Sequence, residues 1–276
     1  MQYAQMVCAM SRNIGDEIQS LAAAQFLPRV DLFVDREHLD AVKSQEPIAL
    51  IMNGWFMHTK AWPPSDSIRP AFVSFHVEPE SRDLIAKHAD YLKQFEPIGT
   101  RDRGTAEFLN SIGIKATVTY CLTLSFPRRE REPVNGRVAI VDARDIAVPK
   151  SLSRGAVTLR HGIRMFADAT KLQHARELLA FYRDEVRLVI TTRLHCALPC
   201  IAMGIPVVYF GDPNDYRTAI ISDVGGRIYR RALHSRSLLG LPGRLVEPVD
   251  WSPKPLDVEL VKAKLREELN KRLLVS

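Results

Sequence analysis

The chain has 276 residues, of which 46% are hydrophobic and 25% are charged, the ordinary composition of a globular protein. This length predicts one large or two modest domains with a full core, and we expect neither a disordered tract nor a signal peptide. The net charge of +6 fits an anionic partner, but no nucleic-acid-binding motif accompanies it, so we expect no nucleic acid partner.

Cysteine usage and hydropathy favour a reduced, cytoplasmic protein without a metal site. The cysteines match no zinc-binding spacing, and we interpret them as small buried side chains at positions 8, 121, 196 and 200. The longest apolar stretch, residues 188–210, contains Arg193 and His195. It therefore predicts a buried strand–helix–strand unit rather than a membrane-spanning helix.

The N-terminal part alternates between helical and strand patterns. A helix opens at the turn of residues 13–16, where Asp16 is the expected cap. The elements that follow in chain order are strands at 30–34, 48–52 and 71–76, a helix at 81–95, a strand at 98–100, a helix from about 101 to 113, and a strand at 115–120.

A charged stretch with two prolines, residues 126–136, is the expected linker between two domains. The alternation then resumes with strands at 137–141, 156–159, 187–190 and 205–210, and with helices at 169–182 and from 193 to 204. An amphipathic helix closes the chain. These patterns predict domains at 1–126 and 137–250 and a final helix within 256–276.

The alternation of strands and helices predicts parallel sheets. Two such sets around one linker predict an α/β protein made of two doubly wound, Rossmann-like lobes that face a cleft. In such folds ligands bind outside the carboxyl ends of the strands, near helix starts. The polar residues at those positions are therefore the candidate functional residues.

The strongest candidate is the run from Val189 to His195, where a buried strand leads into a helix. Thr192 is the expected cap, the helix start favours an anion, and Arg193 supplies a fork of donors for phosphate or carboxylate. His195 is placed to donate to an anion or to act as a general acid. The alternative is that Arg193 pairs with a structural carboxylate and His195 packs in the core.

Two further helix starts carry candidate residues. Arg101 follows the strand at 98–100 and meets Arg193 if the lobes face each other, or else it caps a neighbouring helix on the surface. Gly15 permits a tight turn or the close approach of a ligand. Asp16 is either a base or only a helix cap.

The segment at 53–58 follows a strand and combines the amide, aromatic and imidazole groups that are typical of sugar contacts. It opens with Asn53 and Gly54, and a turn with a buried tryptophan explains it equally well. His76, at the end of the strand at 71–76, either joins a site at the sheet edge or only lines the sheet.

Four segments in this order resemble the polysaccharide pyruvyl transferase family, across roughly residues 13–225. They are Asn-Ile-Gly-Asp at 13–16, Thr-Arg-Asp at 100–102, Thr-Arg-Leu-His at 192–195 and Gly-Ile-Pro at 204–206. The chain departs from the family in having Tyr120-Cys121 where an Asp-Pro pair is frequent. It also has Arg217 as the nearest counterpart of a lysine that commonly follows the Gly-x-Pro strand.

The resemblance implies a fold like that of glycosyltransferase-B enzymes, with the final helix crossing back to the first lobe. It implies phosphoenolpyruvate as donor and co-substrate, with no other cofactor. The acceptor it implies is a sugar of an exopolysaccharide or a lipid-linked oligosaccharide, on which a pyruvate ketal forms. On the donor side it implies His195 as general acid, together with Thr192, Arg193, Leu194 and Arg101.

The acceptor side is expected in the first lobe, with Asp16 as the base. The other expected acceptor contacts are Asn13, Gly15, Asn53, Gly54, His76 and Arg217. Two other interpretations remain open: a glycosyltransferase that uses a nucleotide sugar, and a non-catalytic homologue that binds sugar or acts as a scaffold.

A peripheral contact with the inner face of a membrane is also open. The late basic residues are Arg227, Arg230, Arg231, Arg236 and Arg244, and lipid-linked sugars would lie at such a surface. For the final helix, a brace that crosses the lobes is the preferred interpretation.

Overall fold

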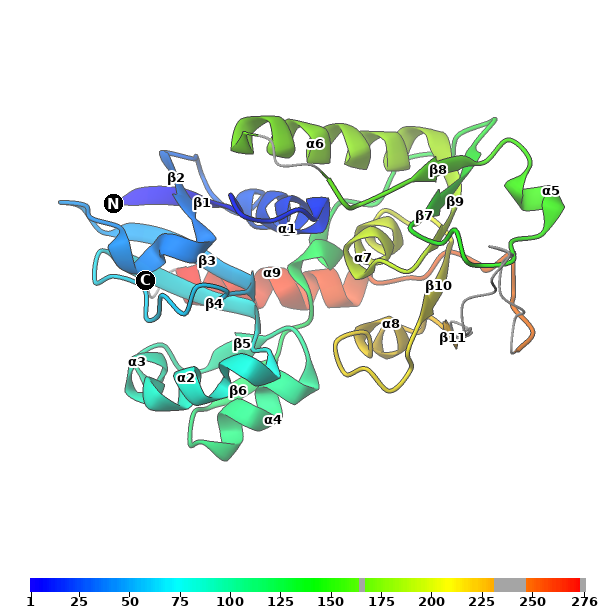
Figure 1. The fold of residues 1–276 in the computed structure, drawn as a ribbon. Coiled ribbons are helices and arrows are strands. Elements are labelled where there is room, and N and C mark those ends of the chain that lie inside the picture. The colour runs from blue at the N-terminus through cyan, green and yellow to red at the C-terminus, as the bar shows by residue number, and fades with distance from the viewer. Residues whose placement is uncertain (164–166, 231–246, 274–276) are drawn as a thin grey trace.

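The computed structural model describes residues 1–163, 167–230 and 247–273, and its framework is two parallel β-sheets (Figure 1). The first sheet has the order β2-β1-β3-β4-β5-β6, with β1 (Gln2–Val7), β2 (Leu32–Asp35), β3 (Ile48–Trp55), β4 (Ile68–His76), β5 (Ile98–Thr100) and β6 (Ala116–Val118). The second sheet has the order β11-β10-β9-β7-β8, with β7 (Arg137–Val141), β8 (Val157–Leu159), β9 (Val186–Thr191), β10 (Val207–Gly211) and β11 (Ile228–Arg230).

Helices flank both sheets. The N-terminal half, which carries the first sheet, contains α1 (Ile14–Ala24), α2 (Arg82–Lys87), α3 (Ala89–Lys93) and α4 (Arg103–Ser111), with 3₁₀ turns η1 (Arg36–Ala41), η2 (Pro79–Ser81) and η3 (Leu122–Ser125). The C-terminal half contains α5 (Lys150–Ser153), α6 (Asp168–Glu185), α7 (Leu194–Ala202) and α8 (Ile220–Asp223), and α9 (Glu259–Leu273) follows it.

The strand order of each sheet reverses once. In the first sheet the reversal lies between β1 and β3, and in the second it lies between β7 and β9. A reversal opens a crevice at the carboxyl ends of the two central strands, where doubly wound proteins bind their ligands. The predicted α/β class with parallel sheets is confirmed, and each sheet offers one such crevice.

The local structure differs from the prediction at several elements. The helix expected at 81–95 is two helices, because the backbone of His88 (φ −111, ψ 31) leaves the helical region between α2 and α3. Strands β1 and β11 and the four-residue helices α5 and α8 were not predicted. β11 has only three residues. β1 buries the polar Gln5 through a hydrogen bond from its side chain to Ser20 Oγ at 2.9 Å, which weakens its apolar pattern.

The two halves share one hydrophobic core on one side of their junction. A single cluster of buried side chains combines Ile14 and Ile18 of α1 with Leu172 of α6 and Ala197 of α7. Lys171 of α6 is buried there, and its ammonium group lies 3.3 Å from Glu17 of α1 and 3.0 Å from Asp168. These contacts fix α6 of the second half against α1 of the first.

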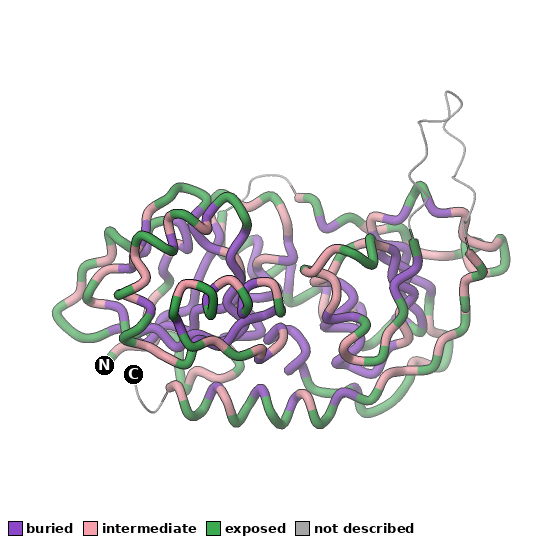
Figure 2. Tube along the Cα trace, turned by 90° about the horizontal axis from the view of Figure 1, so that it is seen from below, coloured by how far each residue is buried: buried purple, intermediate pink, exposed green. Residues whose placement is uncertain are grey.

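The final helix crosses from one half to the other. Figures 1 and 2 show α9 running along both halves. Leu265 and Leu269 of α9, and Val258 just before it, are buried in the shared core. Lys262 is also buried and donates to the carbonyl of Ala202 at 2.7 Å. The apolar side of the final helix therefore packs on the protein itself.

No helix within the described residues is both long and apolar enough to span a membrane. Of the late basic residues, Arg231, Arg236 and Arg244 lie outside the described residues. Arg227 forms an ion pair with Glu247 at 3.0 Å.

Candidate functional site

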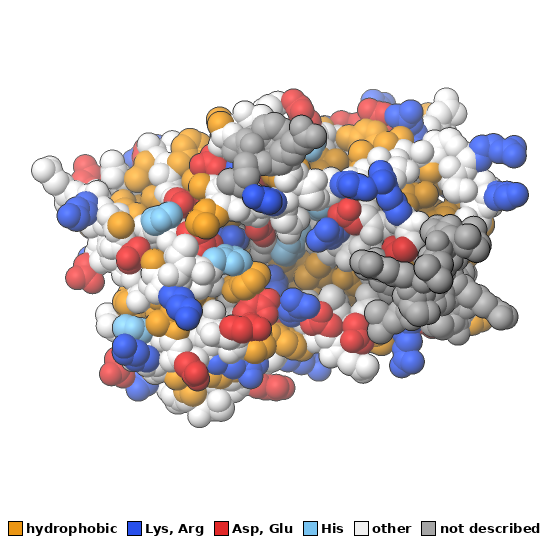
Figure 3. Space-filling model, viewed as in Figure 1, with side chains coloured by type: hydrophobic (Ala, Val, Ile, Leu, Met, Phe, Trp, Pro, Cys, Tyr) orange, Lys and Arg blue, Asp and Glu red, His pale blue; other side chains and the backbone are white. Residues whose placement is uncertain are grey.

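A cleft of about 960 Å³ lies between the two halves. Figure 3 shows the hollow, with acidic, basic and histidine side chains around it. From the N-terminal half it is lined by Asn13, Asp16, Gln19, Trp55, His76, Glu78 and Arg101. From the C-terminal half it is lined by Asp142, His161, Thr192, Arg193, Leu194, His195, Tyr209, Phe210, Gly211, Asp212, Pro213, Asn214, Asp215, Arg217, Thr218 and Arg230.

Two helix starts face this cleft, and they differ in how their amides are bonded. At α1, the Asn13 side chain accepts from the Gly15 amide at 3.2 Å, and the Ile14 amide donates to the His161 carbonyl at 2.9 Å. Asn13 is thus the cap, and the prediction that Asp16 caps this helix is wrong. Asp16 lies within the first turn instead.

No side chain in the described part of the chain caps the start of α7. Thr192 was expected to cap it, but the Thr192 hydroxyl donates to the Asp142 carbonyl at 2.9 Å, and Arg193 takes the cap position. Because the first amides of a helix have no acceptor within it, the start of α7 favours an anion, whereas the bonded start of α1 does not.

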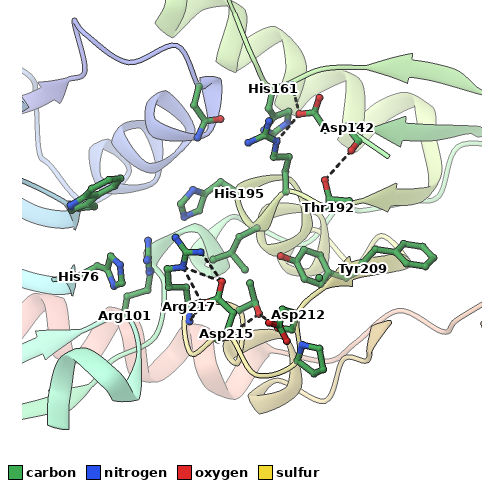
Figure 4. Close-up of a pocket in the computed structure, with 18 of the residues that line it drawn as sticks. His76, Arg101, Asp142, His161, Thr192, His195, Tyr209, Asp212, Asp215 and Arg217 are labelled. Carbon is green, nitrogen blue, oxygen red and sulfur yellow. Dashed lines mark hydrogen bonds and ion pairs between the residues drawn. The ribbon is translucent and has the colours of Figure 1, made fainter. Parts of the chain in front are cut away.

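The Arg101 side chain is buried, with 6% of the residue exposed, and it lines the cleft. Its Nε lies 3.7 Å from Asp102 Oδ2 and has no hydrogen-bond partner in the described part of the chain. Figure 4 shows Arg101 between His76 and His195. A buried guanidinium without full hydrogen bonding is costly, and an anionic ligand would complete its bonding.

His195 lies on the first turn of α7, close against α1. A Cβ atom at Gly15 would lie 3.0 Å from the His195 Cβ, so the glycine permits the two helix starts to approach. Burial and the positive charge of Arg101 lower the pKa of His195 to about 3. The imidazole of the ligand-free protein is therefore neutral near neutral pH.

His76 is fully buried between two carboxylates. Its Nδ1 lies 2.6 Å from Asp102 Oδ2 and its Nε2 lies 3.3 Å from Glu78 Oε1. The hydrogen bond to His76 lowers the pKa of Glu78. Burial raises the pKa of Asp102, but its hydrogen bonds, the one to His76 foremost, and the nearby positive charge of Arg101 together outweigh burial and leave the pKa lowered. Both groups are therefore carboxylates near neutral pH.

Arg193 is held by a carboxylate, as the alternative interpretation predicted. Its Nε donates to Asp142 Oδ2 at 2.7 Å, and its side chain is 45% exposed at the edge of the cleft. The same Asp142 oxygen accepts from the His161 amide at 3.0 Å. Asp142 directly follows β7, the neighbour of β9, so it organises the crevice of the second sheet.

Asp16, the expected base, is held by three neighbours. Its Oδ2 accepts from the Ser11 hydroxyl at 2.6 Å and lies 3.4 Å from Arg36 Nη1, and its Oδ1 accepts from the side-chain Nε2 of Gln19 at 3.2 Å. Arg217 lines the cleft and pairs with Asp215 at 2.8 Å and with Glu78 at 3.4 Å.

Three of the expected site residues do not line the cleft. Gly15 packs behind it against His195, and Asn53 donates to the Gln19 carbonyl at 2.9 Å. Gly54 has a φ of +103° and lies against the Gln19 side chain. Gly54 and Asn53 therefore support α1, while Trp55, the next residue along β3, lines the cleft.

Sequence reasoning missed Asp142 and His161 as site residues. A signal existed for both, because Asp142 ends one predicted strand and His161 follows another. Two strand ends form a crevice only if the strands are neighbours in the sheet. The order of the strands in the sheet could not be derived from the sequence alone. Among the described residues, no group of three or more potential metal ligands is present.

Comparison with known proteins bears on this site. No curated protein matches the sequence significantly. A crystal structure of a functionally uncharacterised protein from Klebsiella pneumoniae is similar with a TM-score of 0.49 and 13% sequence identity, over 82% of this chain and 92% of that one. The family model for polysaccharide pyruvyl transferase matches residues 13–213, which include both helix starts, Arg101 and His195. The chain therefore belongs to the polysaccharide pyruvyl transferase family, a family of transferases.

Proposed function

We propose that the protein transfers a pyruvyl group from phosphoenolpyruvate to a sugar of a polysaccharide or lipid-linked oligosaccharide. The observation that carries the donor assignment is the buried Arg101 guanidinium, whose Nε has no hydrogen-bond partner among the described residues. The same cleft holds the start of α7, which no described side chain caps. Phosphoenolpyruvate carries a carboxylate and a phosphate. It therefore offers one anion to Arg101 and another to the start of α7 and Arg193.

The chemistry joins two hydroxyls of one sugar to C2 of the donor. One hydroxyl oxygen bonds to C2 while C3 takes a proton, so the double bond is lost. The second hydroxyl then bonds to C2 as the bond between C2 and the phosphate oxygen breaks. The products are a pyruvate ketal and inorganic phosphate. Arg101 and Arg193 balance the charge of the departing phosphate.

His195 is the proposed donor of the proton to C3. Its pKa of about 3 in the free protein arises from burial and from Arg101. An anion bound to Arg101 offsets that positive charge, so donor binding is expected to raise the pKa of His195 toward the range in which an imidazole serves as general acid. The acid then forms only when the donor is present.

The acceptor is assigned to the N-terminal side of the cleft. Trp55 offers an aromatic surface there, and Asp16 offers a carboxylate for the sugar hydroxyl. Asn13 and His76 line the same side, and Arg217 reaches it from the other half through Glu78. Gly15, Asn53 and Gly54 act by supporting α1.

The test measures thermal unfolding with phosphoenolpyruvate, a nucleotide sugar or inorganic phosphate. A ligand at about 100-fold its dissociation constant should stabilise the wild type by about 2.7 kcal/mol. Arg101→Ala should lose the stabilisation by phosphoenolpyruvate, while Arg176→Ala, on the exposed face of α6, should keep it. His195→Gln should keep the binding and lose roughly 10²–10⁴ in turnover.

A nucleotide-sugar glycosyltransferase is the second candidate, because Arg193 and the start of α7 would equally suit a diphosphate. Stabilisation by the nucleotide sugar and not by phosphoenolpyruvate would favour it. A folded protein that responds to none of the three ligands would favour the non-catalytic homologue.

A further inference from the structure

His161 lines the cleft, and the proposed mechanism gives it no role. It follows β8 and is fully buried. Its amide donates to Asp142 Oδ2 at 3.0 Å, and its carbonyl accepts from the Ile14 amide at 2.9 Å. These two bonds fix His161 where the crevice of the second sheet meets the start of α1.

The two ring nitrogens of His161 have different surroundings. Nε2 lies 3.0 Å from the hydroxyl oxygen of Tyr182, a fully buried residue of α6. The same oxygen accepts from the Cys196 thiol of α7 at 3.5 Å. Nδ1 is buried and has no hydrogen-bond partner among the residues that the structure describes.

This arrangement selects one tautomer of His161. The geometry of the contact makes the Cys196 thiol the donor to the Tyr182 oxygen. The single phenolic proton is then available for His161 Nε2, which must accept it. The neutral form of the His161 ring therefore carries its proton on Nδ1, as a buried N–H group without an acceptor among the described residues.

Buried N–H groups are almost always bonded in native proteins, so an unbonded one beside a ligand cleft indicates a partner that arrives with the ligand. We propose that His161 Nδ1–H donates a hydrogen bond to an anionic oxygen of the bound phosphoenolpyruvate. Tyr182 and Cys196 are positioning residues that hold the required tautomer. This inference rests on the proposed function and adds a donor-binding residue to it.

The link through Asp142 indicates which end of the donor is involved. One oxygen of Asp142 accepts from both the His161 amide and Arg193 Nε. His161 and Arg193 are therefore fixed by the same carboxylate at the start of α7. The anion that binds there is the one His161 contacts, while Arg101 binds the other.

The test compares two substitutions that place an amide at different ring positions. Asparagine keeps an N–H group near the position of Nδ1, whereas glutamine places it near Nε2. His161→Gln should weaken phosphoenolpyruvate binding by roughly 10- to 100-fold, the range for a hydrogen bond to a charged group. The dissociation constant of His161→Asn for phosphoenolpyruvate should stay within about threefold of the wild-type value. Thermal unfolding without ligand verifies that both variants fold.

The tautomer is measured separately by ¹⁵N NMR of the histidine ring. The wild type should show the proton on Nδ1, and Tyr182→Phe, which removes the phenolic proton, should move it toward Nε2 and weaken binding. A wild-type proton on Nε2 would overturn the positioning role. If the wild type does not bind phosphoenolpyruvate, the proposed function fails. If it binds and both His161 variants bind equally well, only the role of His161 fails.

Discussion

The two sides of the junction between the halves are built differently. On the packed side, α1, α6 and α7 share one hydrophobic core, with Lys171 buried inside it. On the polar side, the segment after β10 reaches the N-terminal half through two ion pairs, Arg217–Glu78 at 3.4 Å and Arg103–Asp223 at 2.8 Å. Partly exposed ion pairs contribute only about 0–1 kcal/mol each.

The difference between the packed side and the polar side indicates where the molecule is rigid and where it can open. The starts of α1 and α7 lie on the packed side, so His195 is held in place before any ligand binds. Arg217 lies on the polar side, where little apolar surface would be exposed by a movement. We therefore expect the cleft to open at the polar side and to turn about the packed side.

The largest loss of stability is expected when the buried charge of Lys171 is removed from the packed side. Burial raises the pKa of Glu17, and the charge of Lys171 opposes that rise. Lys171→Met should lower the free energy of unfolding by about 3–5 kcal/mol, because Glu17 stays buried without its cation. Urea unfolding measures this loss.

Lys93→Met is the matched control, since Lys93 pairs with Asp90 at 3.0 Å on the surface. It should cost less than about 1 kcal/mol. Equal, small losses for the two variants would contradict the packed side as the rigid one. Glu17→Gln in the Lys171→Met background should recover part of the loss.

The same glycine substitution can be made on both sides. On the packed side, a Cβ at Gly15 would lie 3.0 Å from the His195 Cβ, and on the polar side a Cβ at Gly104 would lie 2.6 Å from the Tyr216 ring. Gly15→Ala should cost about 1–3 kcal/mol because two fixed helices must separate. It should also slow turnover.

Gly104→Ala should move Tyr216 and cost less than about 1 kcal/mol, since the gain in helix propensity offsets part of the strain. Urea unfolding and turnover of both variants provide the comparison. A larger loss of stability at Gly104 than at Gly15 would show that the polar side is the more tightly built of the two.

The smallest effect is expected for Arg217→Ala, which removes the ion pair with Glu78 across the polar side together with the pair to Asp215. It should cost up to about 1 kcal/mol. The hydrogen bond to His76 and then the charge of Arg217 lower the pKa of Glu78 from its ordinary 4.5. A lowered folded-state pKa contributes stability above the ordinary value and loses it as the pH falls through the folded value.

The difference in stability between the wild type and Arg217→Ala should therefore be largest above about pH 4.5 and should shrink in more acidic solution. Urea unfolding across this range measures it. A difference that grows as the pH falls would rule out Glu78 as the partner that matters.

Local patterns were sufficient for most of the elements and for part of the cleft. The stretch from Val189 to His195 could be recognised from the sequence, because the strand, the helix start and the polar side chains are contiguous in the chain. Both helix caps were assigned to the wrong residue, Asp16 and Thr192. Asparagine, aspartate and threonine near a helix start are all good caps, and the backbone geometry selects among them.

The sequence by itself determined the α/β class, the positions of most strands and helices, and the family. Periodicity and contiguous motifs are properties of neighbouring residues, so they can be read directly. Only the tertiary structure decided that Asn53 and Gly54 support α1, that Asp142 and His161 join the cleft, and that one side of the junction is packed. These facts depend on the order of the strands in each sheet and on which charged groups are buried side by side. Contacts between residues distant in the chain set both.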